Sequence, residues 1–354
     1  MIRRGSKEES LVEQIVRTST QKHIDNPPKT DLFPTGCTVY NLALGGGHPV
    51  GKIINIVGDK STAKTLLATE VVALARTLYG DKFEWWYDDA EAGYSLPVEE
   101  VYGFNIIPDE MIASETVEEF GRNIERKLDL LDDGKYFIYV LDTLDGLPSE
   151  AEIKRQDKIK KLLEKGKEID TGTYGLNKQK YMSEFFRTLC RKIKRKNCLL
   201  IIVSQVRENI GVTFGAKYVR MGGKALDFYA SQVIWLAEAE KHYKKDRATG
   251  ITIKAKITKN KEGKPFRQCY IDILFDYGVD DIMSNINFLY DLKTETGKQK
   301  KTEQVVWDGE KYSVRRLVRH IEQNNLEDEL KNRTIQKWND VEESISSKDR
   351  KRRF

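Results

Sequence analysis

The stretch IINIVGDKSTAKT, residues 53 to 65, decides the fold because it leads from an apolar strand into a phosphate-binding loop. The loop pattern G-x-x-x-x-G-K-[ST] requires a strand before it and a helix after it. IINIV supplies the strand, and TLLATEVVALARTLY has the pattern of the helix. Ala63 replaces the second glycine of the pattern, but its side chain is small enough for the backbone to approach a phosphate closely.

Backbone N–H groups at the start of such a helix hold phosphate, with the positive end of the helix dipole behind them. The sequence therefore predicts a nucleotide site in which Lys64 reaches the β and γ phosphates and Thr65 binds Mg²⁺. The residues predicted to form this site are Gly58, Asp59, Lys60, Ser61, Thr62, Ala63, Lys64 and Thr65.

The composition is that of a main domain of ordinary size with one or two smaller units, since 39% of the 354 residues are hydrophobic. No apolar run reaches the ~18 residues that a membrane helix needs. The start, MIRRGSKEESLVEQIV, lacks the apolar core and cleavage site of a secretory signal. The four cysteines lack zinc-ligand spacing, which favours reduced thiols. We therefore expect a cytoplasmic protein, or one in the host cytoplasm if a phage encodes it, with no membrane partner.

Positive charge is concentrated in two segments, although the net charge is only +5. These are KRQDKIKKLLEKGK, residues 154 to 167, and the last residues, KDRKRRF. Basic runs indicate a polyanionic partner, and a solvated surface is the alternative. The first segment has Ile159, Leu162 and Leu163 at helical spacing. It predicts a helix that either contacts DNA phosphates or packs on the protein surface through these three residues.

Four short apolar runs, IINIV, EWWYD, YFIYVLD and LLIIVS, alternate with segments of helical pattern. This order predicts an α/β fold, a mainly parallel sheet with helices on both faces. Further strands are predicted at QVIWLA, ITIKAKIT and QCYIDILF, the last two as a half-exposed edge hairpin. We expect an N-terminal helix and linker over residues 1–31, a core over residues 32–279 and a small, mainly helical C-terminal domain with a basic tail over residues 280–354.

Two carboxylates follow predicted strands. Asp142 ends YFIYVLD, where a carboxylate can hold Mg²⁺ through water, although an Asp that caps the next turn is the alternative. Glu91 comes shortly after EWWYD, where it can polarise an attacking water, and a surface acid is the alternative.

Five segments occur in an order that resembles the bacterial RecA recombinase family and its phage relatives. The resemblance covers Leu32 to Tyr277 and is most specific from Ser204 to Ser231. The segments are FPTGCTVYNLALGGGHPVGKIINIVGDKSTAKT, YDDAEAGY, VLDTLDGL, SQVRENIGVTFGAKYVRMGGKALDFYAS and KNKEGKPFRQCYIDILF.

The resemblance implies a RecA-like ATPase core that uses ATP and Mg²⁺. It assigns Lys64 and Thr65 to the phosphate loop, Asp142 to water-linked magnesium and Glu91 to catalysis. Gln205 matches a glutamine that senses the γ phosphate and couples it to a DNA loop. The lysines of KNK match residues that reach the ATP of a neighbouring subunit, with a charged hairpin end as the alternative; these are Lys259 and Lys261.

A long loop after LLIIVS carries the implied DNA contacts. Cations for phosphates, apolar or aromatic groups for bases and a mobile backbone are what single-strand binding needs. A connection of this length is unusual inside a compact domain if it is only structural. The expected DNA-binding residues are Arg207, Ile210, Phe214, Arg220, Gly222, Gly223 and Lys224, with Tyr174 and Lys178 near a first DNA loop.

The sequence departs from the bacterial family pattern at several positions. Ala63 stands in place of glycine, and Val98 stands where the family often has a tyrosine under adenine. The segment from Lys154 to Thr171 is longer and more basic, and the end of the chain is basic instead of acidic. These departures favour a divergent, phage-type member.

The sequence therefore predicts a DNA-dependent ATPase that forms a filament of its own copies on single-stranded DNA and pairs that strand with a homologous duplex. The expected helpers are a single-strand-binding protein and a loader. A ring helicase and a DNA-binding scaffold that does not hydrolyse nucleotide are the alternatives. The segment from Gly211 to Ser231 and the KNK pair argue against the helicase. The joint presence of Lys64, Glu91 and Gln205 argues against the scaffold.

Overall fold

The computed structural model describes residues 31–108, 110–164, 176–208, 218–220, 223–301, 304–347 and 350. The predicted N-terminal helix and linker, residues 1–31, lies outside the described residues except for its last position. Within the described part of the chain, no helix combines the length and the apolar character that crossing a membrane requires.

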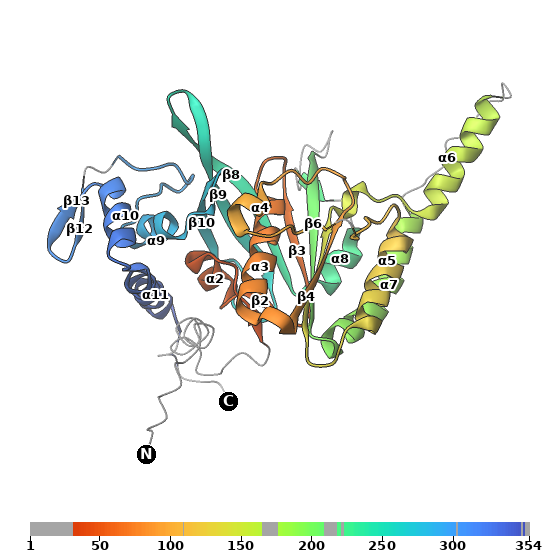
Figure 1. Ribbon diagram of the computed structural model, residues 1–354, viewed down its shortest axis with the longest axis horizontal. Helices are drawn as coiled ribbons and strands as arrows, with labels where there is room; N and C mark the ends of the chain where they lie inside the picture. Colours follow the sequence, from red (N-terminus) through yellow and green to blue (C-terminus); the bar gives the residue numbers. More distant parts are fainter. Residues whose placement is uncertain are drawn as a thin grey trace, which may run out of the picture.

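One large sheet forms the centre of the molecule, in the strand order β11-β10-β9-β8-β3-β6-β5-β4, with β7 paired to β6 (Figure 1). Strands β4, β5, β6, β3 and β8 are parallel to one another. The strands are β3 (Ile53–Gly58), β4 (Phe83–Asp89), β5 (Tyr136–Asp142), β6 (Cys198–Glu208), β7 (Tyr218–Arg220), β8 (Gln232–Lys244), β9 (Arg247–Asn260), β10 (Gln268–Leu274) and β11 (Gly278–Val279). The predicted parallel sheet is confirmed.

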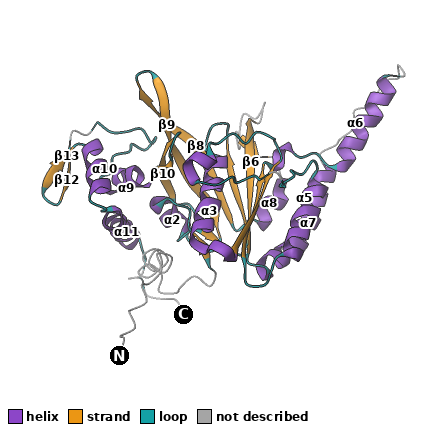
Figure 2. Ribbon diagram, in the orientation of Figure 1, coloured by secondary structure: helices purple, strands orange, loops and turns teal. Residues whose placement is uncertain are grey.

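Helices cover both faces of this sheet (Figure 2). Ile54 and Ile56 of β3 pack into the cluster that contains helix α3, whereas Ile53 and Val57 pack into the cluster that contains α5 and α7. Both sides of the strand are therefore apolar, as its sequence predicts. The helices are α2 (Thr38–Leu44), α3 (Lys64–Tyr79), α4 (Val98–Tyr102), α5 (Val117–Leu130), α6 (Glu150–Leu163), α7 (Leu176–Arg195) and α8 (Gly223–Tyr229). Short pieces are β1 (Leu32–Phe33), β2 (His48–Pro49), and the 3₁₀ turns η1 (Gly80–Lys82) and η2 (Leu144–Gly146).

Strands β9 and β10 pair in antiparallel fashion at one end of the sheet, where only the two-residue strand β11 lies beyond β10. β9 lies between β10 and β8, with which it forms a longer hairpin, and β11 covers β10. Alternating hydrophobicity reports that one face of a strand is less buried, and it carries no information about the strand's place in the sheet.

The chain after residue 280 has a hydrophobic cluster of its own, built around Trp307, Leu317 and Ile321. Its elements are α9 (Asp281–Leu289), β12 (Val305–Trp307), β13 (Glu310–Tyr312), α10 (Val314–Gln323) and α11 (Glu327–Ser344). This separate cluster supports the predicted boundary at residue 280, and the division into domains stays a prediction.

A buried ion pair ties this C-terminal segment to the sheet. Lys293 Nζ lies 3.2 Å from Asp272 Oδ1 on β10, and the two side chains are only 5% and 2% exposed. Thr252 and Asn287 also donate to the Asp272 carboxylate, at 2.5 and 2.7 Å. Because a buried charge without its partner is costly, this cluster holds α9 against β9 and β10.

We predict that Lys293→Met lowers the free energy of unfolding by about 3 kcal/mol, the lower end of the range for breaking a buried pair, because Thr252 and Asn287 still donate to Asp272. Urea denaturation followed by tryptophan fluorescence measures the change. The exposed pair of Lys241 and Glu238, 3.6 Å apart, provides the control. Lys241→Met should cost less than about 1 kcal/mol. Equal effects of the two substitutions would contradict a stabilising role for the buried pair.

Candidate active site

Four parallel strands end side by side, and most of the predicted site residues lie at that edge of the sheet. The register pairs Gly58 at the end of β3 with Gln205 of β6, and Asp89 at the end of β4 with Asp142 of β5. Glu91 follows β4 by two positions. The carboxyl edge of a parallel sheet is where α/β proteins bind ligands. The fold therefore brings together residues that lie more than one hundred positions apart in sequence.

The phosphate loop leaves the sheet at Gly58, where a Cβ atom would lie 2.4 Å from Thr62 Oγ1. Ser61 and Ala63 both have left-handed backbones, with φ of 58° and 60°. An L-residue in that region costs roughly 1–2 kcal/mol, which explains why the pattern has glycine at the position of Ala63. Ala63 adopts the loop conformation nonetheless.

Asp59 organises the loop from within. Its carboxylate accepts a hydrogen bond from the backbone N–H of Lys60 at 2.7 Å. Its backbone carbonyl accepts from Thr62 Oγ1 at 2.8 Å and from Lys64 Nζ at 2.6 Å. The loop therefore curls around its own lysine at the start of α3.

The Lys64 ammonium is buried, with only 8% of the residue exposed. Burial lowers the pKa of Lys64, and the nearby charges of Asp142 and Glu91 oppose that shift. Among the residues that the structure describes, no carboxylate lies within ion-pair distance of this ammonium. A buried cation at a helix N-terminus without an anionic contact fits a phosphate ligand.

Thr65 and Asp142 lie together beside the loop. Thr65 Oγ1 donates to Asp142 Oδ2 at 2.6 Å, and the Tyr87 hydroxyl donates to the same oxygen at 2.9 Å. Burial raises the pKa of Asp142, while these two hydrogen bonds oppose the shift. A hydroxyl and a carboxylate oxygen at the edge of a phosphate loop are ligands that suit Mg²⁺. Tyr87 was not predicted, because it is one of several aromatic residues in an apolar strand.

Glu91 and Gln205 are directly connected. The Gln205 side-chain amide donates to Glu91 Oε1 at 2.6 Å, and Thr143 Oγ1 donates to the same oxygen at 2.7 Å. The backbone N–H of Gln205 donates to Asp145 Oδ2 at 2.5 Å. Thr143 and Asp145 were missed in the sequence, although both belong to the VLDTLDGL segment that carries Asp142. The turn after β5 thus positions both the carboxylate and the glutamine.

β6 continues past Gln205 and pairs with β7, so the long predicted DNA loop begins at the site. The backbones of Arg207 and Arg220 lie in this hairpin, and Gly223 and Lys224 open helix α8. Four of the expected DNA contacts, Ile210, Phe214, Gly222 and Tyr174, fall outside the described residues. Lys178 Nζ donates to the carbonyls of Leu144 and Leu147 at 3.0 and 2.5 Å. The DNA-binding role of all these residues stays a prediction.

Lys259 and Lys261 lie at the opposite edge of the sheet from the phosphate loop. Asn260 pairs with Gln232, which in turn pairs with Ile54 near the start of β3. The length of β3 from Ile54 to its end, about 13 Å, separates the two edges. Lys259 donates to the carbonyls of Asp227 and Phe228, and Lys261 to that of Phe228 at 3.4 Å. These carbonyls belong to the last turn of α8.

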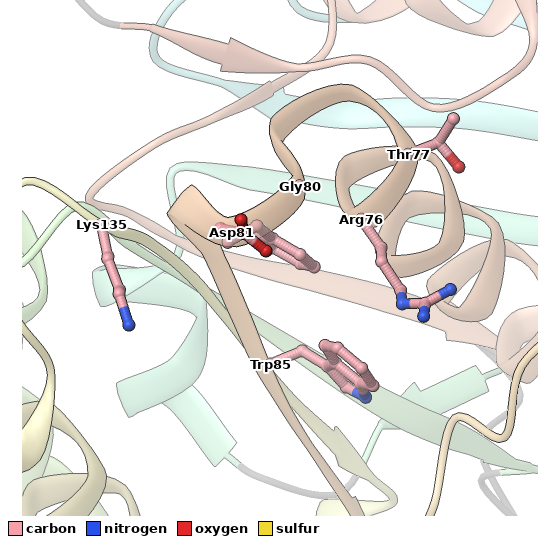
Figure 3. A pocket seen from close by; sticks show the side chains of 7 residues that line it. Arg76, Thr77, Gly80, Asp81, Trp85 and Lys135 are labelled. Atoms are coloured by element: carbon pink, nitrogen blue, oxygen red, sulfur yellow. The ribbon is translucent and has the colours of Figure 1, made fainter.

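The position assigned to adenine contact, Val98, is only 4% exposed and belongs to the main core. It therefore presents no surface on which a base can stack. A separate hollow of about 610 Å³ is lined by Arg76, Thr77, Gly80, Asp81, Phe83, Trp85 and Lys135 (Figure 3). It lies at the end of α3 opposite Lys64, a helix length of about 24 Å away, and so is not part of this site.

Comparison with known proteins identifies the family. Residues 13–280 match the model of the RecA N-terminal domain, which is more than half of the chain. The chain belongs to the RecA family. Protein RecA of Paracoccus denitrificans is 32% identical over 285 residues, covering 78% of this chain and 72% of that protein.

Protein RecA of Clostridium perfringens (strain 13 / Type A) is 33% identical over 253 residues, covering 71% of this chain. The match spans 66% of that relative, just under two thirds of its length. The crystal structure of the RadB recombinase superposes with a TM-score of 0.48 and 18% identity, covering 70% of this chain and 98% of that one. The predicted RecA-like fold class is confirmed by the family match.

Two substitutions in this RecA-family loop test whether it functions. We expect Lys64→Ala to abolish ATP hydrolysis stimulated by single-stranded DNA, because the buried cation is lost. Ala63→Gly should leave turnover intact or raise it, and should raise the free energy of unfolding by up to about 1 kcal/mol, since glycine adopts the left-handed region without strain. Steady-state phosphate release and urea denaturation measure the two effects. Equal turnover in wild type and Lys64→Ala would mean that the loop does not function.

Proposed function

We propose that this RecA-family chain is an ATP-dependent DNA recombinase. It forms a helical filament on single-stranded DNA, pairs that strand with a homologous duplex and hydrolyses ATP when DNA is bound. The observation that carries the proposal is the hydrogen bond between Gln205 and Glu91. It joins Glu91, which is proposed to polarise water, to β6, the strand that leads into the predicted DNA loop. In this proposal, ATP hydrolysis and DNA binding are therefore connected through one hydrogen bond.

The residues of the site have distinct roles in this proposal. Lys64 and the loop N–H groups would hold the phosphates of ATP, and Thr65 and Asp142 would hold Mg²⁺. When bound, Mg²⁺ would supply positive charge opposite the phosphates. Glu91 orients and polarises the attacking water, and its carboxylate is held by Thr143 and Gln205. Movement of Gln205 with β6 would change the position of Glu91.

The neighbouring copy completes the site. Lys259 and Lys261 lie a strand length from Gly58 in the same chain, so they serve an ATP site only if another copy is packed against this edge. A head-to-tail interface of this kind generates a filament or a ring. Helix α8 leads from the predicted DNA loop to the carbonyls that these lysines contact, which connects DNA to the same interface.

The remaining parts of the proposal follow from this activity. The partners are single-stranded DNA, homologous duplex DNA and further copies of the chain, with residues 1–31 as a subunit contact. A single-strand-binding protein and a loader are proposed helpers. The place of action is the cytoplasm, or the host cytoplasm for a phage-encoded protein. The buried Val98 and the strained Ala63 agree with a divergent, phage-type member.

Two alternatives share the same core, a ring helicase and a DNA-binding scaffold that does not hydrolyse ATP. Negative-stain microscopy with single-stranded DNA and a slowly hydrolysed ATP analogue separates the first from the proposal. We expect helical filaments, and closed six-membered rings would favour the helicase. Phosphate release stimulated by single-stranded DNA excludes the scaffold, and its absence in a sample that forms filaments would favour it.

Mixed filaments test the shared site. Lys261→Ala and Glu91→Ala should each abolish turnover alone while the chain stays folded. In an equal mixture, about a quarter of the head-to-tail interfaces join two undamaged halves, so about a quarter of the wild-type turnover should return.

The matched control mixes Lys261→Ala with Lys259→Ala. Both substitutions damage the same half of the interface, so this mixture should recover nothing. The shared site would be ruled out if mixed filaments formed, as shown by labelled subunits, and the first mixture remained inactive.

A further inference from the structure

Helix α6, Glu150–Leu163, extends away from the rest of the molecule (Figure 1). It follows β5 and the turn that holds Gln205, so it starts at the same edge of the sheet as the candidate active site. Its 14 residues correspond to a rod of about 21 Å. No other labelled element lies alongside its C-terminal half in Figure 1.

The base of α6 is firmly anchored. Ser149 is buried and forms a capping box with Glu152, in which each backbone N–H donates to the side chain of the other residue, at 2.6 and 3.2 Å. The backbone N–H of Glu150 donates to Glu118 on α5 at 2.9 Å, and the Glu150 carboxylate pairs with Arg122 at 2.9 Å. The direction of the helix is therefore set at its first turn.

One side of α6 carries a row of lysines. Lys154, Lys158 and Lys161 follow one another at spacings of four and three residues, which places them on one face of a helix, and the exposed Asp157 lies on the same face. All three lysines are exposed. Lys154 lies 3.9 Å from Glu150 but keeps 79% of its side chain exposed. Lys158 and Lys161 make no ion pair with any residue that the structure describes.

The alternative from the sequence, a surface helix packed through its apolar residues, is not supported at Leu163 in the part of the chain that the structure describes. Leu163 is 60% exposed, and Ile159 is partly buried. The side chain of Leu162 falls outside what the structure describes. The helix therefore stands on its base and presents its lysine face to whatever approaches this edge of the sheet.

We propose that the face formed by Lys154, Lys158 and Lys161 binds the phosphate backbone of duplex DNA, independently of sequence. Single-strand sites combine cations with aromatic groups on which bases stack, and α6 has no aromatic residue. A duplex hides its bases and presents one negative charge per about 1.7 Å of axis, so a rigid row of lysines suits it. The inference deepens the proposed function, on which it rests, by naming the element that captures the duplex partner.

Salt dependence of duplex binding tests the proposal. Each phosphate that is neutralised contributes a slope of about 0.9 to the plot of log affinity against log salt concentration. The triple variant Lys154→Gln, Lys158→Gln, Lys161→Gln should therefore flatten the slope for duplex DNA by up to about 2.7. The slope for a single strand should not change. Glutamine and lysine have similar helix propensities, so circular dichroism should show the helix retained.

Matched variants distinguish the effect of a lysine's position around α6 from the effect of its charge. Lys158→Gln alone should flatten the duplex slope by about 0.9, whereas Lys160→Gln should leave it unchanged, because two residues correspond to a rotation of about 200° around the helix. Replacing Lys154, Lys158 and Lys161 by Arg keeps the charge and should keep the wild-type slope.

Three outcomes would overturn the inference. First, the triple glutamine variant could keep the wild-type salt slope for duplex DNA. Second, its salt slopes for duplex and single-stranded DNA could both become flatter. Third, the variant could change self-association in the absence of DNA. The last result would make this face a contact between copies of the chain. Wild-type protein that binds no DNA at all would contradict the proposed function itself. Phosphate release stimulated by single-stranded DNA distinguishes the two cases, because it persists if only the inference about α6 fails and is absent if the proposed function fails.

Discussion

Burial of the parallel sheet on both faces is the constraint on which the rest of the structure depends. Strand β3 is apolar on both sides because α3 lies on one and α5 and α7 on the other. The polar residues of the candidate active site lie at the ends of the strands, where the backbone leaves the core. Because neighbouring strands run the same way, their polar ends meet at one edge, and the loop with Lys64 joins Asp142, Glu91 and Gln205 there.

The same constraint joins the candidate active site to the predicted DNA loop. Gln205 sits where β6 stops pairing with β3 and starts pairing with β7, so one strand belongs to the core at one end and to the predicted DNA loop at the other. The Gln205 side chain donates to Glu91, so the start of the predicted DNA loop is hydrogen-bonded to the candidate active site. The turn after β5 supports both partners through Thr143 and Asp145.

Chain direction separates Lys259 and Lys261 from the phosphate loop within one chain. β9 runs opposite to β3, so its last residues, Lys259 and Lys261, arrive at the edge that the phosphate loop leaves. Residues that belong to one proposed site are thereby held apart within a chain. Helix α8 crosses between the two edges, and its last carbonyls bind these lysines.

The sequence alone determined the main strands and the phosphate loop, and it named most of the residues that the fold brings together at the carboxyl edge of the sheet. Long apolar runs have few alternatives to a buried strand, and the loop pattern depends on local geometry. The tertiary structure decided what local pattern does not encode. It buried Val98, added Tyr87, Thr143 and Asp145, placed β9 between β8 and β10, and left Lys154, Lys158 and Lys161 of α6 exposed among the described residues. These features depend on which segments meet, and contacts between segments distant in sequence leave no periodic signal in either one.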